Sequence, residues 1–302
     1  MNFEWFFFAL ISPFLWAFAN VLDSTIRRNF IKNDYYMMWT SAFIRLPAIL
    51  AIIFFFGLDF PGWFPAIGMI TGGILWSSMF VPYLRALNYE ETSRVALFMQ
   101  MIAVFTLLLG YITLGELLTP KQLASFILIL IGGIFAALKQ TQSKWHFSKA
   151  FWLILITSFF WAASDIIFKY FQTDFISFIS AFNFFLIGSF LTSVLILFIP
   201  NLRREIFKIN AKEIPLKGWI MQAITVLIGI AGSMTFAYAL TLGKVALTSV
   251  LIQTQPLFIL LITPLMICFI PEIEKEDLSK RALLFKGLSF LVITIGLIIL
   301  YF

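Results

Sequence analysis

The chain has 302 residues, of which 61% are hydrophobic and only 12% are charged, and its formal net charge at pH 7 is +6. Soluble domains carry about 25% charged residues, so this composition excludes a soluble globular protein and indicates a polytopic helical membrane protein. Basic residues of membrane proteins gather in cytoplasmic loops, so no nucleic-acid partner is expected. One cysteine, Cys268, and one histidine, His146, exclude an intrachain disulfide and a His-rich metal site, and no cofactor is expected.

Ten apolar windows of about 19 residues predict ten membrane-spanning helices. A helix of about 20 residues crosses the roughly 30 Å hydrocarbon core, so ten helices use most of the chain and leave short loops. The first window lacks the basic region and cleavage site of a signal peptide, so we expect it to be a retained helix. The expected spans cover roughly residues 5–24, 36–57, 64–86, 94–114, 120–139, 149–170, 176–200, 217–241, 245–269 and 283–302.

The second half of the chain repeats short patterns of the first half in the same order. Residues 11–17 (ISPFLWA) return as 156–162 (ITSFFWA), Ser-Ala-Phe of span two returns in span seven, and Arg-Val-Ala-Leu at the start of span four returns as Lys-Val-Ala-Leu in span nine. These matches predict two five-helix units, residues 1–143 and 144–302. Because five is odd, the second unit would lie inverted in the membrane, as is typical of secondary transporters.

The end of span four and the helix after it carry a family resemblance. The stretch from Val95 to Phe135 contains Gly-Glu-Leu-Leu-Thr at 115–119 and two glycines late in span five, and it resembles the EamA-type drug/metabolite transporters. The resemblance implies a doubled five-helix fold and solute transport by alternating access, with substrates that vary among amino acids, nucleotide sugars and vitamins. The second unit has an acidic run at 271–277 in place of the Gly-Glu turn, so no symmetric partner of Glu116 is expected. We expect Glu116 itself to be a helix-end or gate residue.

Arg45 is the candidate binding residue on which the sequence is most informative. It lies about ten residues into span two, where an arginine facing lipid would cost about 2.5–3.5 kcal/mol or more. We therefore expect Arg45 to face a cavity or a paired carboxylate. One interpretation is an anchor for a substrate carboxylate or phosphate, because the guanidinium fork suits planar anions; the other is a structural salt bridge.

A polar face of span one and its copy in span six supply further candidates. Trp16, Asn20 and Asp23 are spaced i, i+4 and i+7, so they share one helix face, and Trp161 and Asp165 repeat the first two positions in span six. In inverted units these faces would approach one cavity, where a tryptophan beside a carboxylate could stack and fix a ligand.

Local ion pairs are the alternative for the two acidic residues. Asp23 could pair with Arg27, and Asp165 with Lys169, because each pair is spaced i, i+4 on its helix. Both interpretations stay open at the sequence level.

The remaining candidate substrate-binding residues are polar or aromatic groups at intramembrane depth. Each could contact substrate, although hydrogen bonds between membrane helices are a common alternative. A mid-span proline follows two of them and frees backbone carbonyls that can line a cavity. The set comprises Trp76, Tyr83, Gln100, Asn183, Tyr238, Gln253 and Gln255.

Together these features predict a secondary transporter for a small polar or amphipathic metabolite, amino-acid-like or another organic solute, in the plasma or inner membrane. We expect a monomer or homodimer, a coupling proton as one candidate driving ion, and no enzyme activity. A membrane enzyme or receptor without transport is the alternative. The sequence lacks the phosphate-binding loop of an ATP-driven subunit, so the chain is not expected to be such a subunit. Of the 20 basic residues besides Arg45, 17 flank the odd-numbered loops, which predicts that both termini face away from the cytoplasm.

Overall fold

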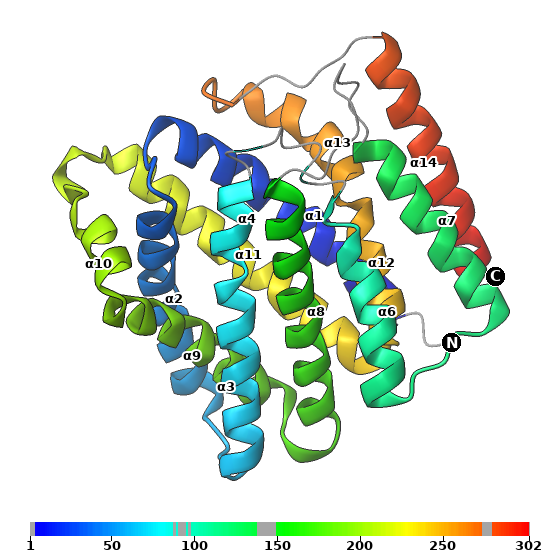
Figure 1. The fold of residues 1–302 in the computed structure, drawn as a ribbon, viewed down its shortest axis with the longest axis horizontal. Coiled ribbons are helices and arrows are strands. Elements are labelled where there is room, and N and C mark those ends of the chain that lie inside the picture. The colour runs from blue at the N-terminus through cyan, green and yellow to red at the C-terminus, as the bar shows by residue number, and fades with distance from the viewer. Residues whose placement is uncertain are drawn as a thin grey trace.

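The computed structural model describes residues 4–86, 89, 95, 98–137, 149–273 and 280–301, and across them every regular element is a helix (Figure 1). The predicted all-α class is therefore confirmed for this part of the chain. Helices suit so apolar a sequence because they satisfy their backbone hydrogen bonds internally, without water. The predicted boundary between residues 143 and 144 lies outside the described residues, as do Arg94, Ala96 and Leu97 of the repeated motif.

The first half contains six described helices, and local sequence explains several of their ends. The side chain of Asn33 accepts a hydrogen bond from the Tyr36 amide and caps the second helix, which ends at Gly57 with a positive φ of 74°. A break at Met79 divides predicted span three into two helices. These helices are α1 (Glu4–Asn29), α2 (Asp34–Phe56), α3 (Trp63–Ser78), α4 (Phe80–Ala86), α6 (Met101–Leu114) and α7 (Pro120–Ala137).

The second half contains seven described α-helices and three short 3₁₀ turns. The loop expected after span seven carries a short helix with Pro200 in its first turn, where the missing amide hydrogen costs nothing. The elements are α8 (Lys149–Phe175), α9 (Phe178–Leu195), η1 (Ile196–Phe198), α10 (Pro200–Phe207), η2 (Ala211–Glu213), α11 (Leu216–Leu242), α12 (Val245–Leu251), η3 (Ile252–Thr254), α13 (Gln255–Ile267) and α14 (Lys280–Tyr301).

Six helices of the described chain are long and apolar enough to cross a membrane, namely α1, α2, α3 with α4, α8, α9 with η1, and α11. A seventh span is formed if residues 245–254 and 257–267 count together across a bend of about 40°. Three further apolar helices are shorter: Met101–Leu114, Pro120–Gly132 and Phe290–Leu300. These lengths and compositions point to a multi-pass membrane protein.

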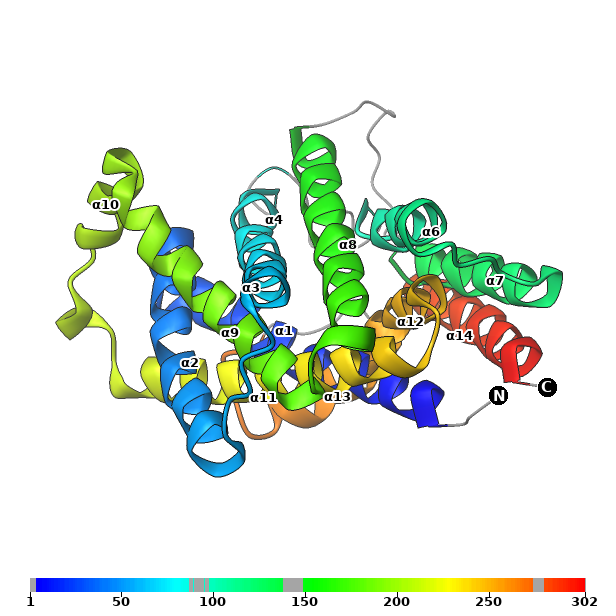
Figure 2. The same cartoon turned by 90° about the horizontal axis from the view of Figure 1, so that it is seen from below.

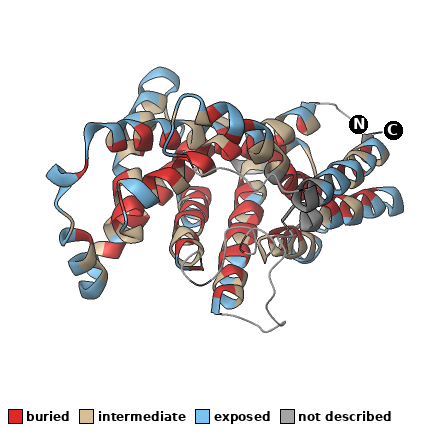
Figure 3. Cartoon of the chain, turned by 90° about the horizontal axis from the view of Figure 1, so that it is seen from above, coloured by how far each residue is buried: buried red, intermediate tan, exposed pale blue. Residues whose placement is uncertain are grey.

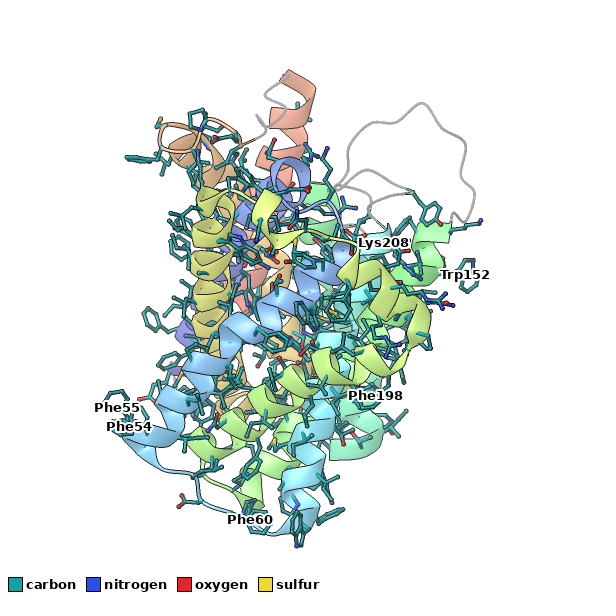
Figure 4. The ribbon with its side chains drawn as sticks, turned by 90° about the vertical axis from the view of Figure 1, so that its left-hand side faces the viewer. Phe54, Phe55, Phe60, Trp152, Phe198 and Lys208 are labelled. Carbon is teal, nitrogen blue, oxygen red and sulfur yellow. The ribbon has the colours of Figure 1, made fainter. Side chains whose placement is uncertain are left out.

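The surface of the protein is rich in phenylalanine, as expected for side chains that face lipid. Phe54, Phe55 and Phe198 are 82%, 74% and 78% exposed, and Figure 4 shows their rings pointing outward from the helices. Buried residues lie on the helix faces that meet other helices, and exposed residues lie on the outer faces (Figure 3). This arrangement suits an apolar solvent because only the interhelical faces need specific packing.

The most extensive helix contacts join the two halves of the chain. α1 packs along α11, α3 packs against α9 and α8, and α7 pairs with α14 at one edge of the molecule (Figures 1 and 2). α3 and α9 touch through backbone: a Cβ on Gly73 would lie 1.9 Å from the Phe185 carbonyl oxygen, and one on Gly188 would lie 2.0 Å from that of Ile70. Only glycine permits so close an approach.

Candidate functional site

A small cavity lies where α1, α3, α8, α9 and α11 meet, and we call it the central cavity. Its volume of about 20 Å³ suits one ordered water molecule rather than an organic solute. Its walls are aromatic and aliphatic apart from one carboxylate and one hydroxyl. The lining residues are Trp16, Trp76, Asp165, Phe168, Phe185, Ser233, Phe236, Ala237 and Leu240.

The two repeat-related tryptophans meet beside the central cavity. The rings of Trp16 and Trp161 pack edge to face with centroids 5.4 Å apart. The indole nitrogen of Trp16 donates to the Gly229 carbonyl at 3.4 Å, and its ring lies where a side chain on Gly232 would otherwise stand. The indole nitrogen of Trp161 is buried and has no hydrogen-bond partner among the described residues. The sequence match between spans one and six therefore corresponds to a physical contact.

Asp165 places a carboxylate in the wall of the central cavity. It is 4% exposed, and its hydrogen-bond partner within the described chain is the Ser249 hydroxyl at 3.4 Å. Lys169, one turn further along α8, lies 2.9 Å from the Glu116 carboxylate and also donates to the Gly243 carbonyl. The structure thus favours the cavity over the local ion pair for Asp165.

Arg45 lies behind the tryptophan of α3 rather than in the cavity wall. It is 8% exposed, donates to the Ser189 hydroxyl at 2.6 Å, and stacks over Trp76 with 5.1 Å between the guanidinium carbon and the ring centroid. The negative charge of Asp23 acts on Arg45. Arg27, the predicted local partner of Asp23, binds Asp34 at 2.7 Å. Arg45 is therefore buried against Ser189 of α9 and Trp76 of α3. Among the described residues it neither lines the central cavity nor forms a direct salt bridge with a carboxylate, whereas the sequence predicted one of the two.

The other predicted site residues do not line the central cavity. Asn183 is fully buried, and both of its side-chain polar atoms lack a hydrogen-bond partner among the described residues. Gln100 and Gln253 are also buried, each with one polar atom lacking such a partner, while Asn20 and Gln255 are half-buried.

Two aromatic candidates pack elsewhere. Tyr238 packs edge to face between Phe8 and Phe178. Tyr83 lies in α4, beyond the break at Met79, and it packs near the start of α8.

Several cavity residues escaped the sequence reasoning. Ser233 is 5% exposed, and its hydroxyl has no hydrogen-bond partner among the described residues. The adjacent small residues Gly232 and Ser233 are typical of close helix packing, and they could have identified this stretch of α11. The phenylalanines Phe168, Phe185 and Phe236 carried no comparable signal, because the chain contains 38 phenylalanines.

A polar network joins the two halves one helical turn from the central cavity, and we call it the Glu116 latch. Gly115 ends α6 in the left-handed region, with φ of 65°, and turns the chain so that the next side chain reaches across. The Glu116 carboxylate binds Lys169 and accepts from the Val245 amide at 2.7 Å. Lys244 donates to the Leu117 carbonyl at 2.5 Å and to Gln122 at 2.9 Å. The latch thus ties the loop after α6 to α8 and the start of α12.

No group of three or more His, Cys, Asp or Glu residues within the described ranges could hold a metal ion. The site offers binding chemistry instead: aromatic faces, one buried carboxylate and unpaired polar atoms.

Comparisons with known proteins agree with the helical architecture. The profile of the EamA-like transporter family matches residues 3–138. One solved structure, described only as a crystal structure of a protein, has a TM-score of 0.69 at 14% sequence identity and covers 97% of this chain and 94% of its own; at this identity it shows the fold alone. No curated protein matches the chain. The resemblance seen in the sequence is confirmed over residues 3–138, which match the EamA-like transporter family.

Proposed function

We propose that the protein is a secondary transporter that moves a small polar or amphipathic metabolite across the membrane by alternating access. The observation that carries the proposal is the central cavity, whose walls come from α1 and α3 of the first half and α8, α9 and α11 of the second. A site between two repeats is where such carriers bind substrate. The cavity holds only about 20 Å³ in this conformation, so substrate binding requires the surrounding side chains or helices to move apart.

The proposal includes ten spans arranged as two inverted repeats. If spans one to five exchange with six to ten, the α1–α11 contact exchanges with α8–α3, and the α1–α13 contact with α8–α6. The α7–α14, α2–α9 and α6–α12 contacts exchange with themselves. The contact between Trp16 and Trp161 lies where such a two-fold axis would pass. These pairings support the inverted repeat, in which four shorter or bent helices complete the ten spans.

The Glu116 latch supplies the gate that alternating access needs. It lies beyond Asp165 on α8 and beyond Leu240 on α11, so it covers one end of the central cavity. The repeat position of Lys169 in α1 is Ser24, so the ion pair between Lys169 and Glu116 has no counterpart at the equivalent position of the first half.

We further propose that both termini face away from the cytoplasm, so that the Glu116 latch closes the outer side. Thiol labelling in a Cys268→Ala background tests this orientation. An impermeant reagent should reach a cysteine at Asp59 in intact cells and miss one at Asn210. The opposite labelling pattern would overturn the orientation and leave the transport proposal standing.

Purified protein in liposomes tests transport directly. A thermal-shift screen against a panel of metabolites, amino acids first, identifies a ligand because binding stabilises the folded state. Radiolabelled ligand should then exchange across the membrane of liposomes preloaded with unlabelled ligand, and protein-free liposomes should show no exchange. Chemical conversion of a bound ligand without flux would support the enzyme alternative and overturn the proposal.

A matched pair of variants connects flux to the central cavity. Ala237→Phe should fill the cavity and abolish exchange, because Ala237 lines it. Ala51→Phe makes the same change at an exposed position of α2 and should leave exchange unaltered. Equal flux in both variants, at equal melting temperatures, would place the substrate path elsewhere.

A further inference from the structure

The central cavity combines a buried carboxylate with an aromatic enclosure, and this combination is selective for positive charge. Among the described residues that line it, Asp165 is the one ionisable side chain, and five of the lining residues are aromatic. Aromatic faces carry negative electrostatic potential and attract ammonium and guanidinium groups. A carboxylate in such surroundings repels an anion and pairs with a cation through charge-assisted hydrogen bonds.

The nearby basic residues are occupied by other groups. Lys169 contacts Glu116 and the Gly243 carbonyl, and Arg45 binds Ser189 and stacks on Trp76 without lining the cavity. Asp165 therefore faces the cavity with Ser249 as its hydrogen-bond partner in the described chain.

A second observation indicates that a polar ligand belongs in this space. Ser233 lines the cavity and is only 5% exposed. Its hydroxyl lacks a hydrogen-bond partner among the described residues. Leaving a buried hydroxyl unpaired costs free energy, and a ligand donor or acceptor beside Asp165 would remove that cost.

Resting on the proposed transport function, we propose that the substrate carries a primary or substituted ammonium group that pairs with Asp165, while its apolar portion packs among Trp16, Trp76 and Phe236. The Ser233 hydroxyl accepts a second hydrogen bond from the same ammonium group. Because the cavity has room for about one water molecule, the aromatic rings must separate to admit the substrate, which couples binding to expansion of the site.

Equilibrium binding to the full-length protein in detergent tests this assignment with three probes of similar size and different charge. Isothermal titration calorimetry with 2-phenylethylamine, 2-phenylethanol and 3-phenylpropionate should rank the amine first and the carboxylate last. Asp165→Asn keeps the side-chain size and the acceptor for Ser249, and it should weaken amine binding by about tenfold or more while leaving alcohol binding unchanged. Glu272→Gln, the same change in an exposed carboxylate paired with Lys217, should bind all three probes as the unmodified protein does.

Two results would overturn the inference. One is tighter binding of the carboxylate than of the amine by the unmodified protein, and the other is unchanged amine affinity in Asp165→Asn, as expected if that carboxylate only carries a proton. Asp165→Glu, which retains the charge, should keep the amine preference and guards against a folding defect. Amine binding without liposome flux would refute transport and leave this site standing. Flux without a preference for the amine would refute this site and leave transport standing.

Discussion

Replacing Arg45 by alanine separates its structural role from a role in substrate binding. The change removes a hydrogen bond from a charged group to Ser189, worth about 1.5–3 kcal/mol, and a buried cation–π contact with Trp76, worth about 2 kcal/mol. It also removes the positive charge that acts on the half-buried Asp23, with which Arg45 makes no direct salt bridge among the described residues. Relief of the desolvation of the guanidinium offsets part of this loss.

We therefore expect Arg45→Ala to destabilise the folded protein by about 2–4 kcal/mol, from the lost hydrogen bond and cation–π contact less that relief. That loss corresponds to a fall in melting temperature on the order of 10 °C for a chain of this size. Arg45→Lys should recover little, because an ammonium cannot reproduce the planar stacking on Trp76. The double variant Arg45→Ala/Asp23→Asn should regain part of that stability, since it also removes the carboxylate that Arg45→Ala leaves without a positive neighbour.

The assay is the melting temperature in detergent alongside exchange in liposomes. Arg203→Ala, which removes an exposed arginine of α10, is the matched control and should change neither quantity. An unchanged melting temperature in Arg45→Ala would refute the structural reasoning. If the double variant is stable but exchanges no substrate, Arg45 anchors the substrate as well; normal exchange by the double variant would end the anchor hypothesis.

Two further predictions concern helix packing and the gate. Gly188→Ala places a methyl group against the backbone of α3 and should destabilise the protein by about 1–3 kcal/mol or more, measured as a lower melting temperature. Gly229→Ala is the control and should be tolerated, because nothing lies within 4 Å of the added atom. Equal melting temperatures of the two variants would contradict the close helix contact. Glu116→Gln removes the ion pair with Lys169, so an impermeant thiol reagent should label a cysteine at Ala237 faster from one side of the membrane. Unchanged labelling rates would show that the latch does not limit access.

The sequence predicted the helical class well because apolar length is a strong one-dimensional signal. Each predicted span overlaps a described helix or helix pair, and six of these helices are long and apolar enough to cross a membrane. The break at Met79 follows from Pro82, because a proline has no amide hydrogen for the carbonyl four residues earlier and its ring crowds that carbonyl, which belongs to Ser78 at the end of α3.

The site was predictable only where a residue was costly in its position. A buried charge or a repeated tryptophan stands out in an apolar chain, so Trp16, Trp161, Asp165 and Arg45 were identified, and three of them lie at or beside the central cavity. Pairing was not predictable, because Lys169 has Asp165 one turn away yet contacts Glu116. Which partner such a residue takes is decided by tertiary contacts between distant segments.

The glycine contact between α3 and α9 also has a consequence for biogenesis. The groove at Gly73 is filled by a helix that is synthesised more than a hundred residues later, around Gly188. At a translation rate of about 5–20 residues per second, α3 resides in the bilayer on the order of ten seconds before its partner emerges. During that interval the face of α3 around Gly73 lacks the helix that packs on it in the folded protein. The nascent first half is therefore an assembly intermediate, and membrane chaperones and proteases would encounter it before the native packing exists.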